Sequence, residues 1–373
     1  MARGVLVEPQ RRGEGPQHLR GGMPVDALLQ PGQVRLADAG QAGQLLAAQP
    51  GGTPPALFRQ AGVRRAHACP ARLEELAEEV VDRHPAKGNP ARVLARVHRR
   101  RDGGGMKTWF ITGASRGFGN VWTDAALARG DRVAATARRP ETLEPLAERY
   151  GDRLLPLALD VTDRSATFDA VARAADAFGS LDVVVNNAGY GLFGMVEETS
   201  EEQARALLET NFFGALWVTQ AALPILRGQG HGHLLQVSSI GGVAAFPSLG
   251  LYNASKWALE GMSEALAQEV APHGVRVTIL EPGPYGTDWS GDSAVRTEPI
   301  AAYDPVREAR RAAAAGHVPV DPAATADVVL GLVDAPEPPL RLFVGGYPYP
   351  VAEAAYRQRL ATWDDWRWLA EKG

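Results

Sequence analysis

TGASRGFG (residues 112–119) places three glycines in the order Gly-x-x-x-Gly-x-Gly between an apolar run and an amphipathic stretch. The preceding KTWFIT favours a buried strand, and the following VWTDAALARG favours a helix. A glycine turn at such a junction suits phosphate binding, because Gly113 permits the tight turn while Gly117 and Gly119 let the backbone approach a pyrophosphate. The chain contains 41 glycines, so the turn alone predicts little and its surroundings decide.

Short apolar runs alternate with helical stretches from Met106 onward. The runs expected to form strands are KTWFIT, RVAATA, LLPLALDV, LDVVVNNAG, HLLQVSS, VRVTILEPG and LRLFVGG. Runs without polar alternation, such as residues 183–185, are typical of strands covered by helices on both faces of a parallel sheet. The pattern predicts an α/β fold with a doubly wound, mainly parallel, seven-stranded sheet of the Rossmann type. Long helices are expected at about 201–227 and 251–271, and an aromatic amphipathic helix at 356–373 is expected to dock on the domain or on a partner subunit.

Residues 1–105 differ in composition from the rest. Only one of the 26 aromatic residues, Phe58, lies there, and 25 of these 105 residues are Gly or Pro. This composition is typical of a disordered segment, within which only residues 71–84 resemble a short amphipathic helix. We expect the natural protein to begin at Met106, with everything earlier an upstream extension, and residues 106–373 to form the folded domain. A nucleic-acid-binding arm is the weaker alternative, because the arginines are interleaved with acids.

Overall composition excludes several classes. A net charge of −4 selects no partner, and no run of 18 apolar residues favours a membrane span. The N-terminal segment has neither the apolar core of a signal peptide nor the serines of a transit peptide. Cys69 is the only cysteine, which rules out an intramolecular disulfide and a cysteine-based metal cluster. We expect a cytoplasmic protein that uses no metal and binds neither nucleic acid nor membrane.

Five further motifs follow the glycine turn in a fixed order. They are NNAG at 186–189, TNFFG at 210–214, VSS at 237–239, YNASK at 252–256 and PGPYGT at 282–287. In this order and spacing the chain resembles the short-chain dehydrogenase/reductase family, in its single-domain branch, from Met106 to about Gly346. The resemblance implies an oxidoreductase that uses NAD(P)(H) to interconvert a carbonyl and an alcohol. It also implies a homodimer or homotetramer formed through the two long helices.

Tyr252 and Lys256 carry the expected chemistry. They lie four residues apart, on one face of a helix, so an ammonium can stabilise a phenolate and lower the pKa of a phenol from about 10. An isolated Tyr-x-x-x-Lys would more simply be a solvated helix face. By the resemblance, Tyr252 exchanges the proton with the substrate, Ser239 orients the substrate oxygen, Lys256 holds the nicotinamide ribose, and Asn211 holds a water behind Lys256. Ser239 is preferred over Ser238, which would point the opposite way along a continuing strand.

Cofactor choice depends on the end of the second strand. Ala137 stands where NAD enzymes place an acid, and Arg138 and Arg139 follow it, so a 2'-phosphate would meet guanidinium groups and no carboxylate. This favours NADP(H) over NAD(H), although solvated arginines would look the same. The full set of cofactor contacts that the resemblance implies is Gly113, Ser115, Arg116, Gly117, Phe118, Gly119, Arg138, Asp160, Val161, Asn187, Ala188, Gly189, Tyr252, Lys256, Pro282, Gly283 and Thr287.

Some of these positions have simpler explanations. NNAG could be a plain turn after a strand, and Asp160 could be a cap at a strand end rather than an adenine contact. Phe118 replaces the aliphatic residue that is commoner in the family, and Pro284 stiffens the loop that carries Thr287.

The substrate pocket is expected beyond the carboxyl ends of the strands, with a substrate loop at about 285–317. Leu192, Phe193, Phe246 and Leu249 predict an apolar small-molecule substrate, or are packing residues. Two other functions stay open: a dinucleotide-binding regulator or scaffold without turnover, and a dehydratase or epimerase that uses the same cofactor site.

Overall fold

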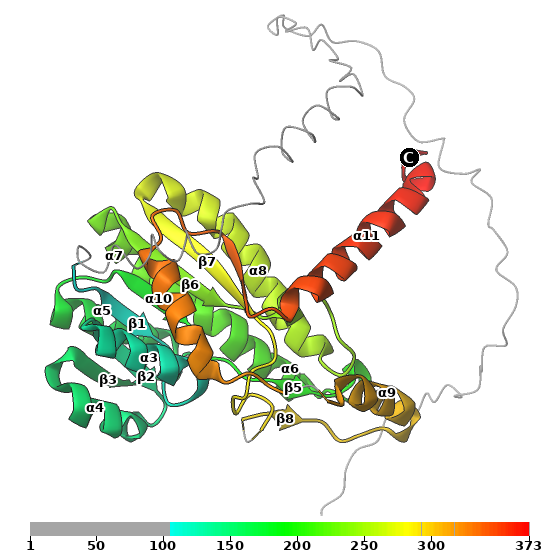
Figure 1. The fold of residues 1–373 in the computed structure, drawn as a ribbon, viewed down its shortest axis with the longest axis horizontal. Helices are drawn as coiled ribbons and strands as arrows, with labels where there is room; N and C mark the ends of the chain where they lie inside the picture. The colour runs from blue at the N-terminus through cyan, green and yellow to red at the C-terminus, as the bar shows by residue number, and fades with distance from the viewer. Residues whose placement is uncertain (1–104, 292, 317, 373) are drawn as a thin grey trace, which may run out of the picture. The chain divides into compact units, whose positions relative to one another are not determined.

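The structure is a computed structural model that describes residues 105–373 except 292, 317 and 373. Its centre is a seven-stranded sheet in the order β3-β2-β1-β4-β6-β7-β9, in which every pairing is parallel (Figure 1). The strands are β1 (Thr108–Ile111), β2 (Arg132–Ala137), β3 (Leu154–Ala158), β4 (Val183–Asn186), β6 (Gly232–Val237), β7 (Val275–Pro282) and β9 (Arg341–Val344). All seven predicted strands and the doubly wound fold are confirmed.

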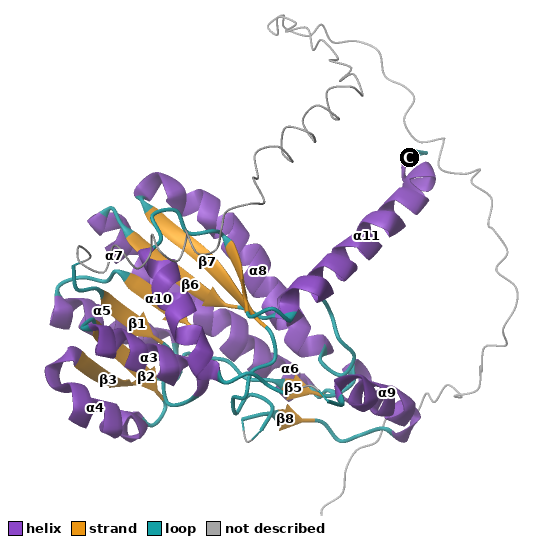
Figure 2. Cartoon of the chain, viewed as in Figure 1, coloured by secondary structure: helices purple, strands orange, loops and turns teal. Residues whose placement is uncertain are grey.

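Helices cover both faces of the sheet (Figure 2). They are α3 (Gly117–Arg129), α4 (Glu144–Tyr150), α5 (Arg164–Phe178), α6 (Glu201–Leu208), α7 (Gly214–Gln229), α8 (Gly250–Val270), α9 (Asp304–Ala314), α10 (Ala326–Asp334) and α11 (Pro348–Ala370). Successive side chains of β1 point to opposite faces of the sheet, so the strand contributes to a hydrophobic layer on each face. Trp109 and Ile111 pack with α3 and α10, whereas Phe110 packs with α5, α7 and α8. Each face therefore buries its own hydrophobic core.

Two elements differ from the expectation. The helix predicted at 201–227 is interrupted by a π-helical turn, η4 (Glu209–Phe213), between α6 and α7. The predicted substrate loop contains α9 and a short strand, β8 (Val295–Arg296), which pairs in parallel with β5 (Leu192–Phe193). The helix predicted at 71–84 and Cys69 lie outside the described residues. These differences matter most where the loop meets the sheet edge, because that is where ligands bind in such folds.

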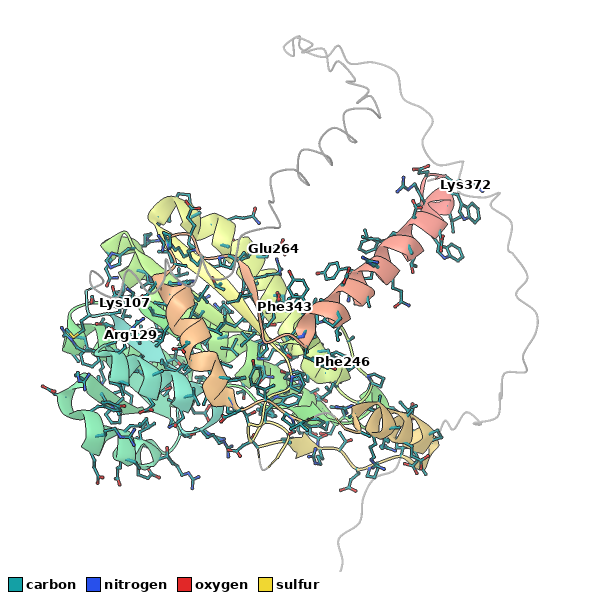
Figure 3. The ribbon with its side chains drawn as sticks, viewed as in Figure 1. Lys107, Arg129, Phe246, Glu264, Phe343 and Lys372 are labelled. Atoms are coloured by element: carbon teal, nitrogen blue, oxygen red, sulfur yellow. The ribbon has the colours of Figure 1, made fainter. Side chains whose placement is uncertain are left out.

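The C-terminal helix α11 forms, but it docks on the domain only through its first half. Tyr349 packs edge-on against Phe343 of β9, with ring centroids 5.4 Å apart, and Arg359 donates to the Val243 carbonyl at 2.9 Å. Beyond Arg359, the side chains of Trp363 and Trp366 are exposed. Figure 3 shows the helix extending from the region of Phe343 to Lys372. Within one chain the predicted docking on the domain thus extends only to the first half of the helix, and docking of its aromatic end on a partner subunit stays a prediction.

Candidate active site

The glycine turn after β1 is held by its neighbours. Gly113 has a φ of 66°, and a Cβ added there would lie 2.9 Å from the Ala188 Cα, so only glycine fits. Asn187 donates its side-chain amide to the Thr112 and Gly113 carbonyls, at 2.8 and 3.1 Å. A Cβ on Gly119 would lie 2.4 Å from the Gly113 oxygen, so Gly119 packs the turn against itself. This packing by itself requires a glycine at position 119.

The N-terminus of α3 is suited to hold an anion. Its N-cap residue, Arg116, makes no side-chain capping bond, whereas α5 and α6 are capped by Asp163 and Ser200. The first-turn amides of α3 are therefore left for another acceptor, and the helix dipole favours a negative charge there. Gly117 has a φ of 58°, and the space where its Cβ would lie meets Thr287 only at 3.6 Å. The turn thus fits a pyrophosphate group.

The ends of the next strands carry the other predicted adenine-side residues. Arg138 follows β2, is exposed, and makes no ion pair with any residue that the structure describes. Arg116 lies 3.7 Å from the Asp288 carboxylate, in the loop after β7. Asp160 accepts from the backbone and hydroxyl of Thr162, at 3.0 and 2.8 Å, which is the capping arrangement left open above. Of Arg116 and Arg138, only Arg138 has no acidic partner among the residues that the structure describes.

The other predicted cofactor contacts surround the same sheet edge. Phe118 stacks on Trp122 with centroids 5.1 Å apart, so its side chain faces the core. Val161 is buried, and a Cβ on Gly214 would lie 2.6 Å from its Cγ2. Ser115 is half-buried, Ala188 donates its amide to the Thr112 hydroxyl at 3.0 Å, and Pro282 ends β7 next to Gly283. These residues therefore lie just after the carboxyl ends of parallel strands, at one edge of the sheet.

Tyr252 and Lys256 occupy one buried face of α8. Each is 5% exposed, and the Lys256 Nζ lies 5.9 Å from the centroid of the Tyr252 ring. The same Nζ donates to the Val237 carbonyl at the end of β6, at 2.8 Å. The Val237 carbonyl thus holds the Lys256 ammonium next to the Tyr252 ring, as the four-residue spacing predicts.

The pKa values of the two side chains follow their burial. Burial raises the pKa of Tyr252 to about 12, and its hydrogen bond with Ser239 lowers it only in part. Burial also lowers the pKa of Lys256 to about 8, against the opposing charge of Glu260. The lowered phenol pKa expected from the sequence is therefore wrong for the ligand-free protein. Removal from water outweighs the nearby ammonium, so Tyr252 holds its proton at neutral pH.

Ser239 lies beside the phenol and Ser238 does not. A Cβ placed on Gly241 would lie 3.1 Å from Tyr252 Cε1 and 3.4 Å from the Ser239 Oγ, so the two side chains border the same point. The Ser238 hydroxyl is buried on the other side, near Glu260. The opposite directions of the two serines match the strand argument made from the sequence.

Asn211 sits in the π-helical turn η4. Its side chain donates to the Tyr190 carbonyl and accepts from the Tyr190 amide, both at 3.0 Å, and donates to the Ser255 hydroxyl at 3.1 Å. A Cβ on Gly189 would lie 3.0 Å from Asn211 Oδ1 and 3.6 Å from Lys256 Nζ. Asn211 and Lys256 therefore face one small space beside Gly189. Such single π turns are common at functional sites.

A cluster of apolar side chains surrounds Tyr252. The predicted pocket residues Leu192, Phe193, Phe246 and Leu249 all belong to it. Trp289, from the loop after β7, was not predicted: its ring centroid lies 4.9 Å from that of Tyr252 and 5.0 Å from that of Phe193. Its place six residues after Gly283, inside the expected substrate loop, is the only sequence signal for it.

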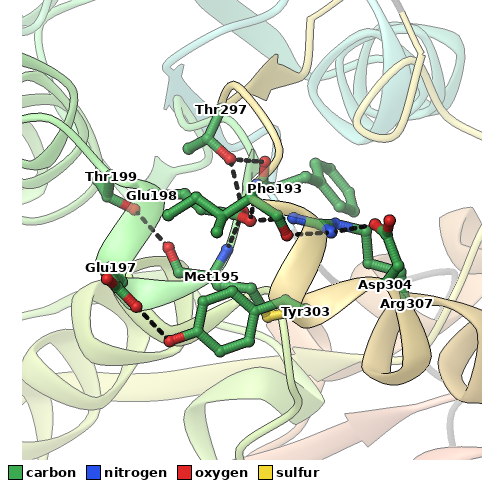
Figure 4. A network of polar contacts seen from close by, with 10 residues as sticks. Phe193, Met195, Glu197, Glu198, Thr199, Thr297, Tyr303, Asp304 and Arg307 are labelled. Atoms are coloured by element: carbon green, nitrogen blue, oxygen red, sulfur yellow. Dashed lines mark hydrogen bonds and ion pairs between the residues drawn. The ribbon is translucent and has the colours of Figure 1, made fainter.

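Glu198 anchors the segment that covers this cluster and was also missed. Its carboxylate accepts from the amides of Met195 and Ile300, both at 2.8 Å, and from the Thr297 hydroxyl at 3.1 Å (Figure 4). It also pairs with Arg307 of α9. One nearly buried carboxylate thus ties β8 and α9 to the segment after β5, because its contacts with Thr297, Ile300 and Arg307 join residues about 100 positions apart.

None of the helices in the described part of the chain combines the length and the apolar character that a membrane span needs.

Known proteins with similar sequences and structures share one family. The profile of the short chain dehydrogenase family matches residues 107–296. The chain is similar to oxidoreductase BOA17 of Botryotinia fuckeliana (strain B05.10), with 43% identity over 71% of this chain and 98% of that protein. A short-chain dehydrogenase from Streptomyces avermitilis has a TM-score of 0.68 at 38% identity, over 72% of this chain and 98% of that one. A short chain dehydrogenase from Burkholderia cenocepacia J2315 in complex with NADP has a TM-score of 0.57 at 28% identity, over 70% and 97%.

Proposed function

This chain belongs to the short-chain dehydrogenase family and is an NAD(P)-dependent oxidoreductase, and from this we propose that it uses NADP(H) to interconvert a carbonyl and an alcohol with Tyr252 as general acid/base. The observation that carries the proposal is the Tyr252 phenol, buried at the sheet edge, hydrogen-bonded to Ser239 and set above Lys256. Intact Asn211, Ser239, Tyr252 and Lys256 argue against a scaffold without turnover.

The proton step uses this chain's own residues. When bound, the nicotinamide supplies or accepts the hydride at the substrate carbon. In the reducing direction, Ser239 holds the substrate oxygen and Tyr252 gives it the phenolic proton, which is present at neutral pH because burial raises the pKa of Tyr252 to about 12. Lys256 places a positive charge near the phenolate that remains. Asn211 and Lys256 border the space through which the proton is replaced.

The cofactor site fits a dinucleotide. The uncapped first turn of α3 and the glycine turn would hold the pyrophosphate, and Arg138 would pair with a 2'-phosphate. Support for NADP(H) comes from the absence of a carboxylate at Ala137 and from the lack of an acidic partner for Arg138 among the described residues. A thermal-shift titration of the full chain with NADPH and with NADH tests this directly. We expect the larger stabilisation with NADPH, and equal shifts would contradict the preference.

The Arg138→Ala variant is expected to lose the preference for NADPH. A hydrogen bond to a charged group contributes about 1.5–3 kcal/mol, so the ratio of kcat/KM for NADPH to that for NADH should fall about tenfold or more. The matched control is Arg139→Ala, whose neighbouring guanidinium is also exposed. Steady-state kinetics with both cofactors give the ratio. An unchanged ratio in Arg138→Ala, or a larger change in Arg139→Ala, would show that Arg138 does not read the phosphate.

The substrate is proposed to be a small molecule with an apolar body. Trp289, Phe193 and Leu249 belong to one apolar cluster with Tyr252, and the guanidinium groups of Arg296 and Arg310 lie over the Phe193 ring. We expect Trp289→Ala to raise KM for an apolar aromatic ketone about tenfold, because an aromatic pair contributes about 0.5–1.5 kcal/mol beyond its buried area. Trp363→Ala, on the exposed end of α11, is the control. Equal KM values in both variants would remove Trp289 from the substrate wall.

The proposal also includes a cytoplasmic homodimer or homotetramer that associates through α7 and α8. Trp257, on α8, is 40% exposed and would lie on that face of the helix. Light scattering of the full chain gives the oligomeric state, and a monomer would exclude this part of the proposal. Nothing in the described structure favours the dehydratase or epimerase reading over carbonyl reduction.

A further inference from the structure

Two buried carboxyl groups lie behind the catalytic lysine. Glu260 follows Lys256 by one turn of α8 and is 6% exposed, and Glu281 stands near the end of β7 and is 1% exposed. Both converge on the guanidinium of Arg341 in β9, whose Nε lies 3.3 Å from Glu260 Oε2 and 3.5 Å from Glu281 Oε1. One nitrogen atom therefore serves two buried carboxyl groups.

The charges around this pair do not balance if both carboxyls are ionised. Arg341 also pairs with Glu264 at the surface of α8, at 2.9 Å, so it is shared by three acids. Lys256 supplies the other positive charge from α8. From β6, the neighbouring Ser238 contributes only a hydroxyl. Arg359 of α11 binds the Val243 carbonyl and neither of the two buried acids.

Burial and mutual repulsion oppose the second negative charge. Burial first, and then the charge of Glu260, raise the pKa of Glu281 to about 8, against the effect of Arg341. Burial also raises the pKa of Glu260, although Arg341 and Lys256 lower it. Two acids that share one buried site keep one proton between them.

The pair adjoins three parts of the catalytic site. Glu260 is four residues from Lys256, and Glu281 immediately precedes the Pro282-Gly283 turn. A Cβ on Gly242 would lie 2.4 Å from Ser238 Oγ and 3.1 Å from Glu260 Oε1, so the glycine at this position allows the carboxyl to pack behind Ser239. The Oε1 atoms of both acids are buried and accept no hydrogen bond from the described residues, although Glu281 Oε1 lies 3.5 Å from Arg341 Nε. Buried carboxyl oxygens that lack hydrogen bonds point to an electrostatic role rather than to a structural hydrogen-bond network.

We propose that Glu260 and Glu281 share one proton at neutral pH, and that the ionised Glu260 is the counter-charge that keeps Lys256 protonated for the reaction. Both are positioning residues, because they act on Lys256 and do not touch the phenol. As pH rises, the pair gives up the shared proton, and Glu260 stays ionised beside Lys256. This inference rests on the proposed role of Lys256, so its test needs one measurement that does not depend on turnover.

The first measurement is thermal stability as a function of pH in wild type and Glu281→Gln. Between pH 4.5 and about 8, the folded wild type binds a proton that the unfolded chain does not, so its stability falls as pH rises through that window. Glutamine has no such proton. We therefore expect the melting temperature of Glu281→Gln, relative to wild type, to rise by a few degrees between pH 5 and pH 8.5. A constant difference would overturn the shared proton, whether or not the enzyme is active.

The second measurement is the pH dependence of kcat/KM. Loss of the Glu260 charge lowers the pKa of Lys256 further, so Glu260→Gln should move the alkaline limb about one pH unit lower, and Glu260→Asp should restore part of the shift. Glu264→Gln is the control, since Glu264 binds the same Arg341 but is exposed. An unmoved limb in Glu260→Gln, or an equal shift in Glu264→Gln, would overturn the effect on Lys256. A failure of the proposed function is distinct, because Tyr252→Phe would then keep its activity.

Discussion

Replacing Tyr252 with phenylalanine is expected to lower kcat for carbonyl reduction about 10³-fold, the usual contribution of a positioned acid. The variant removes one oxygen atom and keeps the ring, so its packing against Trp289 should stay intact. The phenol lies next to Ser239 and Lys256, where a substrate oxygen held by Ser239 could take its proton. Affinity for NADPH, measured by thermal shift, should therefore change little while turnover is lost.

The control for this prediction is Tyr190→Phe. Tyr190 lies in the same apolar cluster and loses the same atom, but its hydroxyl has no role in the proposed proton transfer. We expect the kcat of Tyr190→Phe to stay within about twofold of the wild type, because a hydroxyl that takes no part in the reaction can be removed with little effect. Unchanged carbonyl reduction by Tyr252→Phe would show that another group donates the proton, and equal losses in both variants would indicate damage to the pocket.

The raised pKa of the Tyr252 phenol also affects how the two reaction directions depend on pH. A phenol with a pKa near 12 is fully protonated at neutral pH and can donate its proton, whereas the phenolate needed as a base for oxidation is scarce there. Alcohol oxidation should therefore rise with pH while reduction stays level around neutrality. The ratio of the two initial rates across pH 6–10 measures this difference.

The fold could be predicted because its signals are local and repeated. Val183, Val184 and Val185 are apolar on successive positions, which only a strand covered on both faces tolerates, and each of the seven such runs became a strand of one parallel sheet. The crossover between parallel strands then leaves little choice of topology. The positions of Tyr252, Lys256 and Ser239 followed, since helix spacing and strand ends fix them at one edge.

The remaining features depend on contacts between distant parts of the chain. Trp289 reaches Tyr252 from a loop 37 positions later, and Glu198 binds Ile300 102 positions away. No local pattern marks such partners. The phenol pKa was predicted with the wrong sign because spacing shows the charged neighbour but not the loss of water around the ring. The end of α11 was predicted to dock on the domain or on a partner subunit, and amphipathic composition does not say which of the two a helix packs against.

Replacing Lys256 with methionine is the second change with a large expected effect. Methionine fills nearly the same volume without the charge, so kcat/KM should fall about 10²-fold or more as the phenolate loses its stabilising cation. Binding of NADPH should also weaken, because the proposal gives Lys256 a contact with the nicotinamide ribose. Lys107→Met is the control, since Lys107 forms its ion pair with Asp334 at the opposite end of β1. Steady-state kinetics and a thermal-shift titration with NADPH measure the two effects.

The Lys256→Met variant should be more stable than wild type at neutral pH although its activity falls. This difference distinguishes a functional lysine from a structural one. The folded pKa of Lys256, about 8, lies below the ordinary 10.5, so burying its ammonium costs roughly 3 kcal/mol below pH 8. The lost hydrogen bond to Val237 offsets only about 1 kcal/mol of that. Between pH 8 and 10.5 the unfolded chain binds the extra proton, so wild-type stability rises relative to the variant. We therefore expect Lys256→Met to melt higher than wild type at pH 7 and to lose this advantage by pH 10.5. An inactive variant that also melts lower at pH 7 would mean that Lys256 holds the fold together rather than serving the reaction.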